Sequence, residues 1–184
     1  MRAFVAIPLP EQLREELAGY AAGAVASFGG RAVPAENLHV TIHFLGSVHD
    51  SDEEPLRAAL TPACASIAPF SMSVAAAALA PPNRPRMIWA QLEVPSELAD
   101  LAHAVAASAE PFAPRARPPR TGSPHVTLAR FRRRPPRGAE LSPLEAAGTE
   151  IAVAACELVR SHLGPSGSQY TTVAALPLGR PRGV

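Results

Sequence analysis

The stretches HVTI at residues 39–42 and HVTL at residues 125–128 repeat one pattern, His-Val-Thr followed by an aliphatic residue. Alternate residues of a β-strand face opposite sides of the sheet, so each His shares a face with its own Thr. One such copy is unremarkable on a half-buried strand. Two copies, each preceded by a strand and a helix, predict two similar halves that each present one imidazole and one hydroxyl.

Strands and helices interleave on both sides of the two motifs. Apolar periodicity and turn signals predict strands at 2–8, 38–45, 70–79, 86–94, 125–131, 151–163 and 170–178, and helices at 11–27, 51–67, 96–109 and 140–147. Turn-rich stretches such as APPNRP and GPSGS suggest that hairpins dominate the connections. This order predicts an α+β fold with antiparallel sheets. No linker is long or polar enough to divide the chain, so we expect one domain over residues 1–184.

The composition is that of a globular chain with an uneven charge distribution. Of 184 residues, 47% are hydrophobic, which is enough for a substantial core. The net charge is only +1, yet all 17 basic residues are Arg, and the segment 115–137 contains no acidic residue. Because the guanidinium group binds phosphate in a bidentate manner, this segment around His125 is a candidate phosphate-binding surface.

Cysteine use and the N-terminal residues indicate the compartment. Cys64 and Cys156 are too few and too isolated for a disulfide framework or a thiolate metal site, which predicts reduced thiols. Residues 1–10 hold a short apolar run broken by prolines, which predicts neither a signal peptide nor a membrane span. We expect a cytoplasmic protein without membrane attachment, and nothing in the sequence demands more than a monomer.

The doubled H-x-T-x motif resembles the signature of the two-histidine phosphoesterases. The context narrows the resemblance to the RNA 2′,3′-cyclic phosphodiesterase (2′-5′ RNA ligase) family, through MRAFVAIPLP, ENLHVTIHFLG, PHVTLARF and SHLGPSGSQYTTV. It implies two similar lobes, each an antiparallel sheet with outer helices, around a central catalytic cleft. The chain departs from the family pattern in RTGSPH before the second motif and at His162, where Arg is usual. These departures concern substrate preference more than chemistry.

The resemblance also implies a reaction. The chain would hydrolyse 2′,3′-cyclic phosphates, at RNA ends or on nucleotides, to 2′-phosphates, with His39 as proton donor to the leaving 3′-oxygen and His125 as proton acceptor from water. Imidazole suits both tasks because its ordinary pKa of about 6.5 allows either protonation state near neutral pH, so no metal or other cofactor is necessary. Thr41 and Thr127 would bind the phosphate oxygens. The reverse reaction would form a 2′-5′ linkage.

Strict strand alternation makes two further predictions near the motifs. It places Arg130, a candidate phosphate ligand, on the face opposite His125, and it places His43 on the face of His39. His39 and His43 have the spacing of a helical metal pair, but residues i and i+4 of a strand lie about 13 Å apart. No Glu follows His39 as a zincin motif demands, so we expect no metal site.

Two other functions can be compared with this interpretation, and the sequence argues against the second. The first is a non-catalytic RNA-binding module whose arginines in segment 115–137 follow the phosphate backbone. Aromatic residues, the usual platforms for bases, make up only 5% of the chain, so a substrate-guiding rim of an enzyme is the preferred interpretation. The second is a serine hydrolase at Ser123, but the G-x-S-x-G nucleophile elbow is missing.

Overall fold

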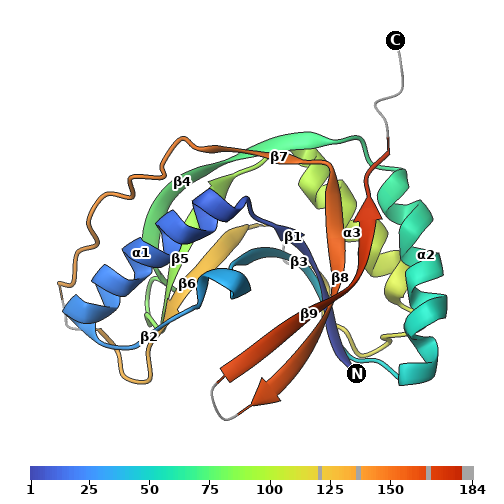
Figure 1. Ribbon diagram of the computed structural model, residues 1–184, viewed down its shortest axis with the longest axis horizontal. Coiled ribbons are helices and arrows are strands. Elements are labelled where there is room, and N and C mark those ends of the chain that lie inside the picture. The colour runs from blue at the N-terminus through green and yellow to red at the C-terminus, as the bar shows by residue number, and fades with distance from the viewer. Residues whose placement is uncertain (120–121, 136–137, 165–166, 180–184) are drawn as a thin grey trace.

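The fold is an antiparallel sheet combined with three α-helices, as the computed structural model shows for residues 1–119, 122–135, 138–164 and 167–179 (Figure 1). In chain order the elements are β1 (Arg2–Pro8), α1 (Glu11–Phe28), β2 (Arg31–Ala32), η1 (Ala35–Asn37), β3 (His39–Ser47), η2 (Asp50–Asp52), α2 (Glu53–Ala65), β4 (Phe70–Ala80), β5 (Met87–Glu93), α3 (Ser96–Ala109), β6 (His125–Arg130), β7 (Glu150–Val153), β8 (Ala155–Gly164) and β9 (Gly167–Pro177). The predicted α+β class is confirmed.

The two predicted lobes are halves of one curled sheet with the strand order β7-β4-β5-β6-β3-β1-β8-β9, and β2 adds to β6. The halves meet at β3 and β6, the two strands that carry the motifs. Among the described residues, Val40 and Val126 are the one bridged pair between these strands. The two motifs therefore lie next to each other at the centre of the sheet.

The helices cross between the halves. Helix α1 follows β1 but packs against β2 and β6, whereas α3 follows β5 but packs against β3 and α2. Figure 1 shows α1 on one side of the molecule and α2 with α3 on the other. Each motif strand is thus covered by a helix that starts from the other half, which ties the two halves together.

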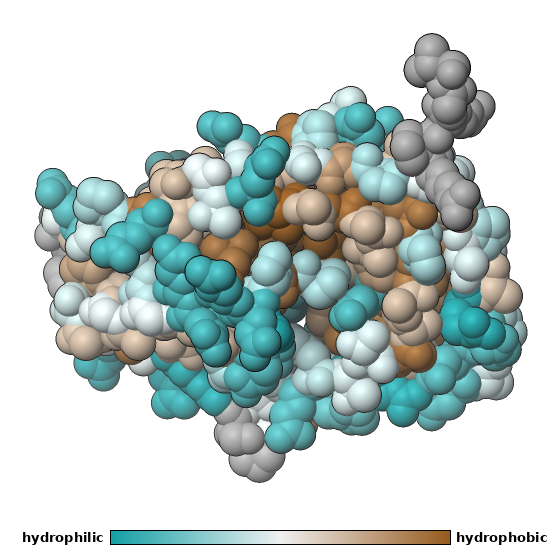
Figure 2. Space-filling view, turned by 45° about the horizontal axis from the view of Figure 1, so that its top comes forward, coloured by the Kyte–Doolittle hydropathy of each residue, from teal (hydrophilic) through white to brown (hydrophobic). Residues whose placement is uncertain are grey.

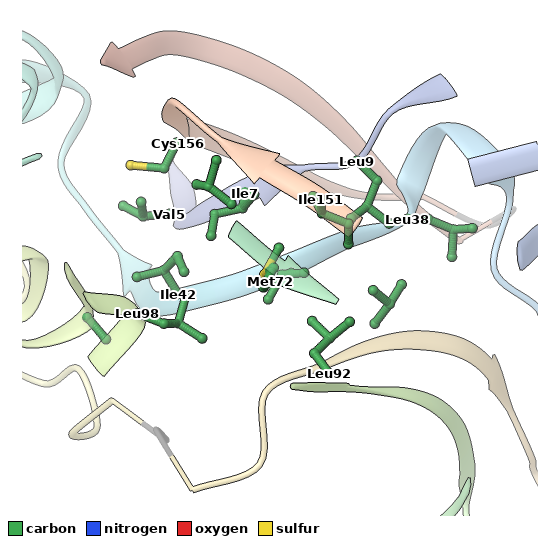
Figure 3. Close-up of a cluster of buried hydrophobic side chains, with 14 of the residues drawn as sticks. Val5, Ile7, Leu9, Leu38, Ile42, Met72, Leu92, Leu98, Ile151 and Cys156 are labelled. Atoms are coloured by element: carbon green, nitrogen blue, oxygen red, sulfur yellow. The ribbon is translucent and has the colours of Figure 1, made fainter. Parts of the chain in front are cut away.

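The main hydrophobic core lies on the helix-covered face of the sheet. Figure 3 shows Val5 of β1, Ile42 of β3, Leu98 of α3 and Cys156 of β8 converging in this cluster. The opposite face of the sheet carries a second, smaller buried cluster around Phe4. At the molecular surface, Figure 2 shows apolar side chains gathered in the middle of the upper half, with hydrophilic ones to the left and below.

Two predicted elements are wrong. The predicted helix at 140–147 is irregular chain and turn, in which Pro143 interrupts a segment too short to nucleate a helix. The predicted strand at 151–163 is two strands, because β7 pairs with β4 in one half and β8 pairs with β1 in the other. Buried apolar residues lie on both sides of the crossing at Ala154, Ile151 and Val153 in β7 and Cys156 and Leu158 in β8, so the apolar pattern runs on through the crossing and hides it.

The two cysteines are close together despite their separation in the sequence. Cys64 of α2 and Cys156 of β8 are free thiols, both buried, with their Sγ atoms 3.4 Å apart. Burial of this contact keeps both thiols away from solvent. In the part of the chain that the structure describes, no helix is long and apolar enough to cross a membrane.

Candidate active site

The two motifs form a four-residue cluster on the face of the sheet opposite the main core. Strands β3 and β6 are antiparallel with Val40 facing Val126, so His39 neighbours Thr127, and Thr41 neighbours His125. The two valines are buried, whereas the histidines and threonines are half-buried. Diagonal neighbours on paired strands lie about 7–8 Å apart, so both imidazoles can reach a group held between them.

A backbone carbonyl orients each imidazole. Nδ1 of His39 is 2.8 Å from the carbonyl oxygen of Asn37, and Nδ1 of His125 is 2.7 Å from that of Ser123. A carbonyl oxygen can only accept, so Nδ1 carries a hydrogen in both rings and Nε2 is the nitrogen that exchanges protons. In neutral His39, Nε2 accepts a hydrogen bond from the Thr41 hydroxyl at 3.0 Å. No sequence pattern pointed to these orienting groups, because any residue can supply a carbonyl.

Burial lowers the pKa of His39 below its ordinary value. The hydrogen bond to the Asn37 carbonyl acts in the opposite direction, and the positive charges of Arg130 and His125 lower the pKa further. The neutral form of His39 is therefore favoured in the unliganded protein. Arg130 and His125 are thus the charged neighbours that act on His39.

A β-bulge in β6 places Arg130 on the face of His125. Thr127 pairs with Trp89 while Ala129 pairs with Ile88, so Leu128 is the extra residue. The predicted opposite face for Arg130 is wrong because strict alternation holds only for an unbulged strand. The Arg130 side chain is exposed and lies beside Met87, with Nη1 3.4 Å from Sδ.

An equivalent bulge in β3 moves His43 away from the cleft. Thr41 pairs with Ala6 while His43 pairs with Val5, so Ile42 is the extra residue. His43 is 4% exposed on the core face, where burial lowers its pKa. The predicted shared face with His39 is therefore wrong, and the two rings are not placed to bind one metal ion. Among the described residues no cluster of three or more His, Cys, Asp or Glu side chains could hold a metal.

Aromatic rings contact both histidines, which the sequence did not predict. Phe4 stacks on His39 with ring centroids 4.8 Å apart, and Tyr170 meets the same imidazole edge-on at 5.3 Å. Trp89 stacks on His125 at 3.7 Å with an interplanar angle of 14°. These rings come from β1, β9 and β5, so their contacts depend on strand pairing. The one available signal was that Trp89 is the only tryptophan of the chain.

A pocket of about 280 Å³ adjoins His39 on the half formed by β1, β8 and β9. This is close to the lower limit of roughly 300 Å³ for small-molecule sites. The lining residues are Phe4, Ala6, Pro8, Leu9, Arg14, Glu36, Leu38, His39, Glu157, Val159, Tyr170 and Thr172. Apolar rings and charged side chains together can hold a flat, polar molecule beside the imidazole.

The arginine-rich segment flanks β6 on both sides. Arg115, Arg117 and the three arginines at 132–134 are exposed, whereas Arg120 and Arg137 lie outside the described residues. His162, the other departure noted in the sequence, is exposed on β8. These exposed arginines lie in the segments that precede and follow β6 in the chain.

Comparisons with known proteins identify the family of the chain. The family model for LigT-like phosphoesterases matches residues 7–89. An RNA 2′,3′-cyclic phosphodiesterase of Methanothermobacter thermautotrophicus is 30% identical over 97% of this chain and 99% of its own length. An RNA 2′,3′-cyclic phosphodiesterase from Thermus thermophilus is 32% identical over 97% of this chain and 90% of its own length. The chain spans 58% of a Geobacillus stearothermophilus relative that is 31% identical.

Solved structures show the same fold. A Thermus thermophilus protein aligns with a TM-score of 0.80 at 30% identity over 98% of this chain and 99% of that chain. Unliganded Escherichia coli LigT aligns with a TM-score of 0.79 at 25% identity, over 97% of this chain and 98% of LigT. The family-model match, the relatives and the structural neighbours place the chain among the LigT-like two-histidine phosphoesterases. Within that class, the chain belongs to the RNA 2′,3′-cyclic phosphodiesterase family.

Proposed function

We propose that this protein hydrolyses 2′,3′-cyclic phosphates, at RNA ends or on nucleotides, to 2′-phosphates by acid–base catalysis with His39 and His125. The observation that carries the proposal is the bridge between Val40 and Val126, which sets the two imidazoles diagonally on one face. Opening a cyclic phosphate in line requires an acid and a base on opposite sides of phosphorus. Two separate imidazoles meet this requirement, and one does not.

Each proton has a defined path in this reaction. Nε2 of His125 takes a proton from water as the water oxygen forms a bond to phosphorus. The bond between phosphorus and the 3′-oxygen breaks, and Nε2 of His39 gives its proton to that oxygen. The carbonyl bonds to Nδ1 hold both rings with Nε2 directed away from the backbone. The product carries a 2′-phosphate and a free 3′-hydroxyl.

The phosphate oxygens are held by the groups between the two histidines. Thr41 and Thr127 share the cleft face with them, and their hydroxyls donate to the non-bridging oxygens. When substrate binds, the Thr41 hydroxyl exchanges its bond to His39 for one to phosphate. Arg130, which the bulge in β6 brings to the same face, adds a charged donor.

The negative charge of the bound substrate favours the protonated form of His39, which is the form that can act as an acid. In the unliganded protein, burial and the neighbouring positive charges lower the pKa of His39. A bound phosphodiester carries one negative charge, which pairs with Arg130 and favours the imidazolium form of His39. We therefore assign the protonation of His39 to the substrate complex.

The pH dependence of the reaction should show this effect. The kcat/KM profile reports the free enzyme, so its decline with rising pH is expected to begin below the ordinary histidine pKa of about 6.5. The decline of kcat, which reports the substrate complex, is expected at higher pH. Steady-state kinetics of a nucleoside 2′,3′-cyclic phosphate from acidic to alkaline pH measure both profiles. His39→Asn is expected to abolish the decline at high pH. If it abolishes the decline at low pH, the two histidines have the reverse roles.

The substrate class follows from the surroundings of the site. Escherichia coli LigT, which shares the fold, has been crystallised with 3′-AMP, which supports a nucleotide in the pocket beside His39. The exposed arginines around β6 would guide an RNA strand to the motifs. With a 5′-hydroxyl in place of water as the nucleophile, the same pair would open the cyclic phosphate, release the 3′-oxygen as a hydroxyl and form a 2′-5′ linkage. One chain carries both histidines, so we propose that the active unit is a monomer formed by the single domain 1–184. The cytoplasm stays our prediction for its location.

Product analysis in the presence of a chelator tests the proposal. Purified protein is expected to convert nucleoside 2′,3′-cyclic phosphates to 2′-phosphates with EDTA present, because acid–base catalysis by imidazole needs no metal. Chromatography that separates 2′- from 3′-phosphates measures the outcome. Activity that disappears with EDTA and returns with zinc would reject the mechanism. A 3′-phosphate product would reject the assignment of the leaving oxygen.

A further inference from the structure

Trp89 and His125 form the tightest ring contact at the site. Their planes are 14° apart and their centroids 3.7 Å apart, whereas Phe4 lies 4.8 Å from His39 at 29°. Trp89 pairs with Thr127 across β5 and β6, so it reaches His125 as a diagonal neighbour on the cleft face. The contact therefore covers one face of the imidazole with the whole indole system.

Two contacts fix the plane of the His125 ring. The Ser123 carbonyl holds the Nδ1 edge at 2.7 Å, and the indole of Trp89 covers the face. An edge contact alone leaves the ring free to tilt about that bond. With the face covered as well, Nε2 is held in one direction.

The indole nitrogen suggests that this packing serves function more than stability. Nε1 of Trp89 is buried and meets no hydrogen-bond partner among the described residues. A buried donor without a partner costs stability, so a requirement other than stability accounts for a tryptophan here. A leucine at this position has no such donor and would not incur this cost.

We propose that Trp89 is a positioning residue for His125, which orients the imidazole and stabilises its positively charged form. The inference rests on the proposed function, in which His125 changes from neutral to cationic as it accepts the proton from water. A cation is attracted to the face of an aromatic ring, and tryptophan has the strongest such attraction. The stabilisation grows toward the transition state, so it contributes to kcat and not only to binding. His39 of β3 acts in the opposite direction when it is protonated, because the two histidines interact electrostatically. Arg130, on the same face of β6, adds further positive charge to this face of the sheet.

The only tryptophan of the chain makes the contact directly measurable. A protonated imidazole in contact with an indole quenches its fluorescence. We expect the emission of the wild-type protein to fall as the pH decreases from alkaline to acidic, and we expect His125→Gln to abolish this change. His39→Gln should shift the midpoint but keep the change. An emission that titrates equally in His125→Gln would overturn the proposal, whether or not the protein has phosphodiesterase activity.

Activity measurements on two substitutions test the role in catalysis. Trp89→Leu is expected to lower kcat about 2- to 30-fold, with a smaller effect on KM, and to move the decline of kcat/KM attributed to His125 toward lower pH. Trp89→Phe keeps an aromatic face and is expected to retain most of kcat. Phe70→Leu, an aromatic substitution in β4 of the same half, is the matched control and should leave kcat unchanged.

Thermal unfolding of all three variants separates catalysis from folding. If folded Trp89→Leu retains the wild-type kcat and pH profile, Trp89 only fills space and the proposal fails. If Trp89→Leu does not fold, folded Trp89→Phe must show an altered midpoint of the kcat/KM profile, and an unaltered one overturns the proposal. If the wild-type protein hydrolyses no cyclic phosphate but its fluorescence titration depends on His125, the proposed function is refuted and the contact between Trp89 and His125 is supported.

Discussion

Replacing His125 by alanine is expected to lower kcat for a nucleoside 2′,3′-cyclic phosphate by roughly 10²–10⁴-fold, and His39→Ala by a similar factor. The physical reason is that each imidazole transfers one proton in the step that opens the ring. The two residues act as a unit, so the double substitution should cost much less than the product of the single losses. Single-turnover rates with excess enzyme measure these changes without interference from product release.

The control is a histidine that the fold keeps away from the cleft. His103 is exposed on α3, and His103→Ala should retain wild-type kcat. His43 is unsuitable as a control because it is buried in the core, where its replacement affects folding. Retention of more than about one tenth of kcat by folded His39→Ala or His125→Ala would contradict the role of that residue.

Arg130→Ala is expected to have the second largest effect, a roughly 10- to 100-fold loss of kcat/KM. This corresponds to about 1.5–3 kcal/mol for a hydrogen bond to a charged group. Arg130→Lys keeps the charge but loses the planar fork, so it should recover only part of the loss. Steady-state kinetics with a mononucleotide substrate measure the effect without contributions from RNA binding.

The expected loss depends on the bulge in β6. In an unbulged strand Arg130 would face the core side, and its replacement would change stability instead of catalysis. Arg57→Ala is the matched control, since Arg57 is exposed on α2 and pairs with Glu54 on the same helix. Such exposed ion pairs contribute little to stability. Equal kcat/KM for Arg130→Ala and Arg57→Ala would show that Arg130 does not contact the phosphate.

Local sequence patterns were sufficient for most elements of the fold. Helix α3 has the predicted bounds, and Leu98, Leu101 and Val105 lie on its buried side as their spacing requires. The prediction of one strand at 151–163 was wrong because β7 and the first half of β8 both contain buried apolar residues, and such a run gives no sign of where a chain leaves one half for the other. Periodicity records burial but not the partner that buries a strand.

In the candidate site, too, some features follow from the local sequence and others only from strand pairing. The sequence by itself determined that two His-Val-Thr units lie on strands with His and Thr on one face, because alternation is a local property of the backbone. Only the tertiary structure decided that Val40 meets Val126, that Arg130 enters the cleft while His43 leaves it, and that Trp89 covers His125. Pairing and bulges depend on hydrogen bonds to another strand, so a pattern within one strand does not contain them.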